Sequence, residues 1–177
     1  FAPKFLGYDQ PQLSATFSAG ALTTIAAQVL FPTLVRRIGP HLTSAFGLLT
    51  LSLGMASQSI VRAQPLHSLF YLINRAGAGI SDTSTATLVA RTSPTADARA
   101  KNLALIQSTR AAARIFTPVV SGSLFAASCG FRRFPGGLPF LTNAACALLA
   151  VPIPLLLRRA ERRADAKAKG SGVEQLY

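Results

Sequence analysis

The chain has 177 residues, of which half are hydrophobic and only 14% carry a charged side chain. Its mean hydropathy of +0.38 is higher than a water-soluble domain of this size can easily accommodate, which makes the membrane class the first hypothesis. Basic residues outnumber acidic ones by 18 to 6, giving a net charge of +12. No basic-aromatic motif accompanies these charges, so we expect no nucleic-acid partner.

Five runs of residues are long and apolar enough to cross a hydrocarbon core about 30 Å thick, which takes about 20 helical residues. They cover residues 13–35, 42–61, 68–90, 102–128 and 138–157, and are bounded by charges or turn residues. None shows the strict two-residue alternation of a membrane barrel, so helices have to satisfy the backbone groups. The predicted fold is therefore an all-α, multi-pass transmembrane helical bundle of about five spanning helices over 13–157. An extracytoplasmic entry segment, residues 1–12, precedes it.

The basic residues gather in short clusters between and after these runs. Eleven of them fall within 36–37, 91–101 and 158–169, and alternation of the helices puts these three clusters on one side. The other side holds only four, namely Lys4, Arg62, Arg132 and Arg133. The positive-inside rule then predicts an outside N-terminus and a basic cytoplasmic tail over residues 158–177. We assign this tail no partner beyond nearby anionic headgroups.

An odd number of crossings that begins outside suggests a fragment, in a chain whose only methionine is Met55. A six-helix unit that begins in the cytoplasm needs one more helix before Phe1. That additional helix is an expectation from the sequence.

Three segments follow one another in a familiar order. The first is "LGYDQPQLSATFSAGALTTIAAQVLFPTLVRRIGPH", which has a Leu-Gly-aromatic entry and a basic exit turn. The second is "LINRAGAGISDTSTATLVARTSP", in which an arginine precedes alternating glycines. The third is "STRAAARIFTPVVSGSLF", which is similar to the pattern Arg-x-x-Gly-Pro-x-x-x-Gly with Thr117 in place of the first glycine. Together they resemble the eighth, tenth and eleventh helices of the major facilitator superfamily.

This resemblance covers roughly residues 5–158, and the basic turn lacks the acid that the family's motif normally carries. It implies the C-terminal half of a secondary active transporter, which moves a small solute by alternating access of two six-helix bundles. The implied partners are the lipid bilayer, a small-molecule solute, a coupling proton and a missing N-terminal helical bundle. The competing interpretations are a non-transporting integral membrane receptor or assembly subunit, and an inactive truncated product.

Charges inside the predicted spans are the candidate functional residues, because a charge near the bilayer centre normally faces a bundle interior or a water-filled cavity. Asp82 is the deepest acid, about 21 Å and about 12 Å of helix from the two ends of its run. Arg75 lies seven residues earlier on the same face, beside Asn74. We expect Asp82 and Arg75 to share a polar interior, bridged by water or by a side chain of another helix. Asp82 is then either a proton-titrating or substrate-contacting carboxylate, or part of a structural ion pair.

Two further arginines lie in the fourth run. Arg110 and Arg114 are four residues apart and share a helical face, with Gln107 one turn before Arg110. Arg110 can snorkel to the cytoplasmic boundary, whereas Arg114 can bind an anionic group or pair with an acid through its bidentate fork. Gln28 in the first run either adds a polar contact or makes an ordinary interhelical hydrogen bond. The candidate substrate or proton pathway consists of Asp82, Arg75, Asn74, Arg114, Arg110, Gln107 and Gln28.

No enzymatic arrangement competes with this interpretation. His41 and His67 fall at opposite membrane edges, and Cys129 and Cys146 lack metal-ligand spacing. The glycine-rich stretch "AGAGIS" follows no predicted strand, so it does not read as a phosphate loop. We expect no catalytic residues, no metal and no cofactor.

Overall fold

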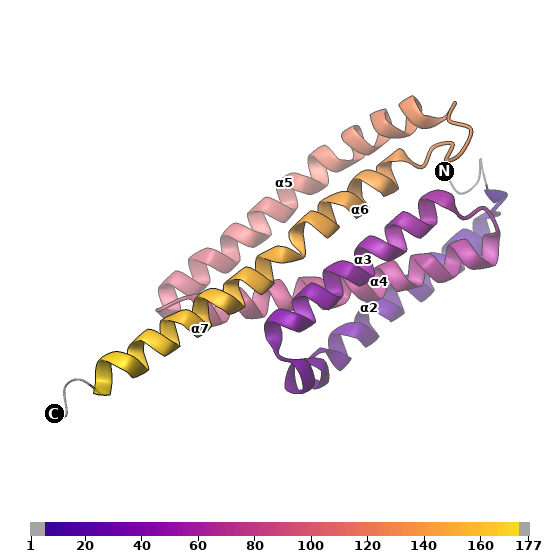
Figure 1. Cartoon of the computed structure of the whole chain (residues 1–177). Coiled ribbons are helices and arrows are strands. Elements are labelled where there is room, and N and C mark those ends of the chain that lie inside the picture. Colours follow the sequence, from indigo (N-terminus) through magenta and orange to yellow (C-terminus); the bar gives the residue numbers. More distant parts are fainter. Residues whose placement is uncertain (1–5, 174–177) are drawn as a thin grey trace.

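The computed structural model of the chain describes residues 6–173, and its long elements are all helices. They are α2 (Gln10–Ile38), α3 (Pro40–Ile60), α4 (Gln64–Thr92), α5 (Ala96–Ser128), α6 (Leu138–Ala150) and α7 (Pro152–Val173). Figure 1 shows them side by side, with α7 extending beyond the bundle. The predicted all-helical fold is confirmed. Residues 1–5 of the predicted entry segment and 174–177 of the predicted tail lie outside the described residues.

Helices α2, α4 and α5 begin before their apolar runs, and polar side chains cap the starts of α2 and α5. The side chain of Asp9 accepts a hydrogen bond from the Gln12 backbone N–H at 2.8 Å, and the Gln12 side chain accepts one from Asp9 N–H at 3.2 Å. This capping box starts α2 before the first predicted span. Thr95 caps α5 by accepting from Ala98 N–H at 3.1 Å. Hydropathy locates the apolar part of each helix, whereas the caps determine where the helix starts.

The last predicted span, 138–157, is divided between α6 and α7 at Val151. Pro152 has no backbone N–H to donate, and Pro154 follows two residues later. Val151 N–H instead donates to Leu148 O at 3.1 Å, three residues back, which tightens the last turn of α6. The prolines therefore interrupt the helical ladder without ending the apolar stretch.

Three stretches are long and apolar enough to cross a membrane by length and composition, namely Gln10–Ile38, Ala96–Ser128 and Leu138–Ala164. The remaining two predicted spans lie in α3 and α4, which are not among these three stretches. These two helices pack chiefly against each other, with α2 on α4 and with α6 and α7 on α3. Neighbouring helices therefore shield α3 and α4, so these helices tolerate serines, glycines and amides that a lipid-facing helix does not.

Glycines allow α4 to approach both of its main neighbours. A Cβ atom on Gly54 of α3 would lie 2.7 Å from the backbone N of Asn74, and one on Gly79 of α4 would lie 2.8 Å from the carbonyl O of Thr24 in α2. A small apolar cluster of Ala27, Phe31 and Ile80 fills the α2–α4 interface nearby. Close backbone approach of this kind holds helices together where lipid supplies no hydrophobic drive.

Polar contacts attach α6 and α7 to α3. Ser52 Oγ donates to the carbonyl of Ala144 in α6 at 2.8 Å, inside a buried interface. Nε2 of the buried His41 lies 2.7 Å from Oε2 of Glu161 in α7, which is half exposed. These contacts join segments about 90 and 120 residues apart in sequence, so they orient the last two helices on the bundle.

Candidate functional site

An ion pair between α4 and α5 is the central feature of the candidate site. Nη2 of Arg110 donates to Oδ1 of Asp82 at 2.8 Å, and the side chains are 33% and 57% exposed, respectively. α5 packs only lightly against α4 and α6, and just 6% of its apolar window is buried. The charge-assisted hydrogen bond is therefore one of the main contacts that hold α5 against α4 at the position of Asp82. A side chain from another helix thus supplies the partner of Asp82.

Arg75 lies two turns before Asp82 on the same face of α4, but it is directed to α2. Its Cγ lies 3.1 Å from the position that a Cβ on Gly20 would take, so its aliphatic stem rests on α2. Thr24 Oγ1 donates to the carbonyl O of Arg75 at 3.3 Å, which fixes the backbone there. Among the described residues, no hydrogen bond or ion pair engages the Arg75 guanidinium.

The other candidates on α5 and α2 are exposed. Arg114 lies one turn from Arg110, and its side chain has no hydrogen bond or ion pair to another described residue. Gln107 and Gln28 are likewise exposed on α5 and α2. The structure therefore brings Asp82 and Arg110 into direct contact, with Arg114 beside them, and leaves the two glutamines on open helix surfaces.

Asn74 occupies a different interface from the other candidates. It is 5% exposed, and its Nδ2 donates to Oε1 of Gln58 in α3 at 3.4 Å. Gln58 is 1% exposed, and its own Nε2 is buried without a hydrogen-bond partner. Sequence reasoning did not single out Gln58, although an amide within an otherwise apolar run is a signal for an interhelical hydrogen bond. Asn74 therefore faces α3, whereas Arg75 faces α2.

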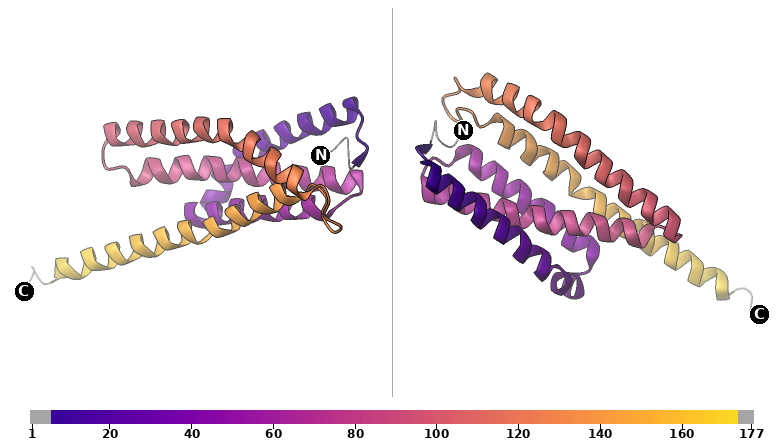
Figure 2. Two further views of the ribbon diagram at one scale, coloured as in Figure 1. Left: turned by 90° about the horizontal axis from the view of Figure 1, so that it is seen from above. Right: turned by 180° about the vertical axis from the view of Figure 1, so that it is seen from behind.

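Four side chains, Arg75, Asp82, Arg110 and Arg114, form what we call the charged stripe. Arg75 contacts α2 and Asp82 contacts α5, so the stripe follows the side of α4 that these two helices flank. Figures 1 and 2 show that α5 begins beside the end of α4 and then diverges from it. Three arginines and one aspartate give the stripe a formal charge of +2. It therefore attracts negative charge.

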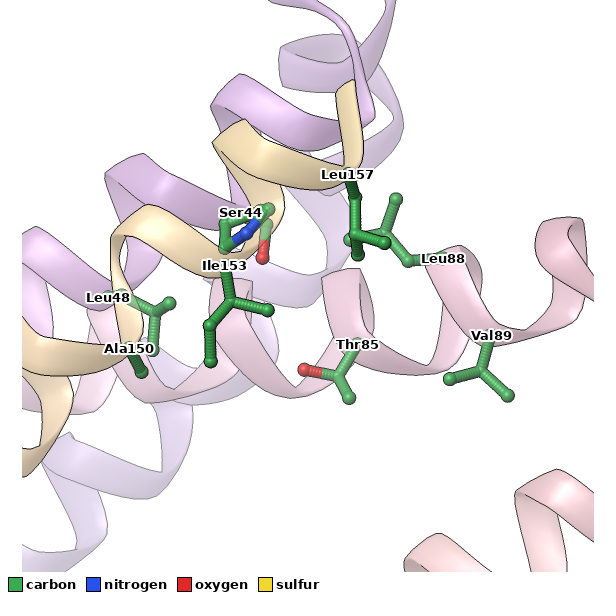
Figure 3. Close-up of a pocket in the computed structure, with 9 residues that line it drawn as sticks. Ser44, Leu48, Thr85, Leu88, Val89, Ala150, Ile153 and Leu157 are labelled. Atoms are coloured by element: carbon green, nitrogen blue, oxygen red, sulfur yellow. The ribbon is translucent and has the colours of Figure 1, made fainter. Parts of the chain in front are cut away.

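A pocket of about 330 Å³ lies apart from the charged stripe, between α3, α4 and the α6–α7 junction (Figure 3). Its lining is mostly apolar, with hydroxyl groups only from two residues. The apolar members include Leu48, Leu88, Val89, Ile153 and Leu157, and the hydroxyl groups belong to Ser44 and Thr85. Such a lining offers no charge to bind or titrate a polar solute.

A buried histidine, His67, lies at the end of the bundle opposite to this pocket, just before the predicted span 68–90. Its ring packs at 6.1 Å from the ring of Tyr8 and at 6.4 Å from that of Phe140. Burial, and then the positive charge of Arg62, lower the pKa of His67 below its ordinary value. The imidazole is therefore neutral at pH 7 and ties the start of α2 to α4 and α6. No group of three or more potential metal-ligating side chains occurs among the residues described.

The comparisons with known proteins agree with the helical architecture. The model of the Major Facilitator Superfamily matches residues 2–175 of the chain. No curated protein and no solved structure gave a match. The match covers almost the whole chain and confirms the predicted family, and the apolar helices agree with an integral membrane protein. The chain belongs to the Major Facilitator Superfamily, a family of membrane transporters.

Proposed function

We propose that this chain is the C-terminal half of a secondary active transporter that moves a small solute by alternating access. The observation that carries the proposal is the ion pair between Asp82 and Arg110, which is partly exposed in the middle of the two long helices α4 and α5. Lipid tails are a costly environment for such charges. The charged stripe therefore faces a water-filled cavity or a second helical bundle, as the two halves of a transporter provide.

The weak packing of α5 suggests how the pair takes part in transport. Protonation of Asp82 converts the ion pair with Arg110 into a contact with a neutral acid, which is a much weaker tie. Because α5 has few other contacts with α4, loss of this tie lets the two helices move relative to each other. Proton binding on one side of the membrane and release on the other would then couple a proton gradient to the exchange between the two open states.

The proposed orientation has the N-terminus outside and the C-terminus in the cytoplasm. Arg36 and Arg37 lie in the last turn of α2 and Arg91 in the last turn of α4, and both helix ends lie at the end of the bundle from which α7 extends (Figure 1). An excess of arginine and lysine at one end marks the cytoplasmic side in membrane proteins.

The test is transport by the full-length protein in proteoliposomes, measured as currents on a solid-supported membrane. The panel contains sugars, amino acids, organic acids and organic cations, each with and without a pH gradient. For a transported compound, Asp82→Asn should abolish the dependence on the pH gradient and preserve exchange without a gradient. The matched control is Asp97→Asn, which breaks an exposed ion pair of the same 2.8 Å length with Lys101.

Two results would contradict the proposal. Unchanged pH-dependent transport by Asp82→Asn would remove the role of Asp82 in proton coupling. The absence of any transported compound for the wild-type protein, in the presence of correctly folded material, would reject the transporter function itself.

A further inference from the structure

The charged stripe has an unbalanced charge that the ion pair does not compensate. The predicted spans contain three arginines and a single acid, Asp82. Arg110 already holds Asp82 at 2.8 Å. Arg75 and Arg114 have no hydrogen bond or ion pair at their guanidinium groups among the described residues. Within the described residues two guanidinium groups at membrane depth therefore have no negative partner, and either a bound anion or an acidic side chain of the second helical bundle has to balance them.

The two uncompensated arginines lie on the same side of the ion pair along the bundle. α4 and α5 run in opposite directions, so positions before Asp82 lie at the level of positions after Arg110. At 1.5 Å per residue, Arg75 is then about 10 Å closer than Asp82 to the end of the bundle that holds the 61–63 turn. Arg114 is about 6 Å closer to that end than Arg110. Along the helix axes, Arg114 and then Arg75 thus lie beyond the ion pair, on the side of the 61–63 turn.

We propose that the solute is a small oxyanion, with a carboxylate or phosphate group, bound by Arg75 and Arg114 beside the pair of Asp82 and Arg110. This inference rests on the transporter function proposed above and specifies its substrate class. A guanidinium forms two parallel hydrogen bonds to a carboxylate or phosphate, which gives both affinity and orientation. A neutral solute would leave both guanidinium groups uncompensated, and a cation would meet the net positive charge of the stripe.

The same oxyanion chemistry is present in a phospholipid headgroup, so the experiment has to separate the two sources. The full-length protein is purified in a non-ionic detergent free of phospholipid, and binding is measured by thermal shift at constant ionic strength. The soluble probes are inorganic phosphate, succinate and benzoate, with glucose and choline as neutral and cationic controls. Dioctanoyl phosphatidylglycerol serves as the headgroup probe.

We expect at least one soluble oxyanion to raise the melting temperature saturably. Arg75→Gln and Arg114→Gln should each weaken its apparent affinity by about tenfold or more, as expected for loss of a charge-assisted hydrogen bond. Arg75→Lys and Arg114→Lys keep the charge but lose the fork, so they should weaken binding less. These lysine variants also keep the proposal testable if a glutamine variant does not fold. Arg36→Gln, which lies outside the stripe, is the matched control.

Several outcomes would overturn the inference. These are a response to none of the three oxyanions, a response to the lipid probe alone, and oxyanion binding that survives in the Arg75 and Arg114 variants. Because binding is measured without transport, the two proposals fail separately. If transport is restricted to neutral or cationic compounds, the proposed oxyanion substrate is rejected and the proposed transporter function remains. Oxyanion binding without any transport rejects the transporter and keeps the ligand class.

Discussion

The substitution Gly54→Ala tests the close contact between α3 and α4. The added Cβ would lie 2.7 Å from the backbone N of Asn74 and 2.8 Å from its Cα and Cβ atoms. Comfortable contacts between carbon atoms are about 3.5–4.0 Å, so the helices have to separate by about 1 Å. Overpacking of this kind costs about 1–3 kcal/mol, and the helix propensity of alanine returns about 0.5–1 kcal/mol. Separation also lengthens the 3.4 Å hydrogen bond between Asn74 and Gln58. We expect a net loss of about 1–2 kcal/mol.

The measurement is unfolding of the full-length protein by SDS in mixed micelles, followed by circular dichroism. Gly122→Ala in α5 is the matched control, because a Cβ there meets nothing within 4 Å. That variant gains helix propensity without a clash and should be neutral or more stable by up to about 1 kcal/mol. If Gly54→Ala were as stable as Gly122→Ala, the close approach of α3 to α4, and with it the reasoning on the bundle core, would be refuted.

Three further predictions concern other parts of the bundle. The pKa of His67 is lowered in the folded state, so the unfolded state binds the proton more readily. The free energy of unfolding should therefore be highest, as far as His67 is concerned, above about pH 6.5 and should decrease as the pH falls below this value. His67→Phe should flatten this dependence in the same unfolding assay, and an unchanged pH profile would contradict the burial of His67. Glu161→Gln removes the charge that His41 contacts at 2.7 Å, so trypsin should cleave α7 up to about fivefold faster, as for a loss of about 1 kcal/mol; an unchanged rate would show that the contact does not hold α7. In intact cells an impermeant maleimide should label the partly exposed Cys129 in the predicted outer turn and spare Cys146 in the middle of α6, and no label on Cys129 would argue for the reverse orientation.

The sequence by itself determined the membrane class, the helical fold and the family. Apolar runs and their flanking charges are local features, and the bilayer imposes its thickness and its demand for internal hydrogen bonds on each run separately. The charges that interrupt these runs, including Asp82 and Arg110, were visible for the same reason. Periodicity also indicated that Arg75 and Asp82 share one face of a single helix.

Only the tertiary structure decided which partner each of these residues has. Asp82 contacts Arg110 of α5, and Asn74 contacts Gln58 of α3. Periodicity within one helix says nothing about how a second helix is rotated or shifted against it. That arrangement depends on packing, here on where glycines such as Gly54 and Gly79 let backbones approach. The chemistry available to each polar side chain therefore follows from contacts between helices that are distant in sequence.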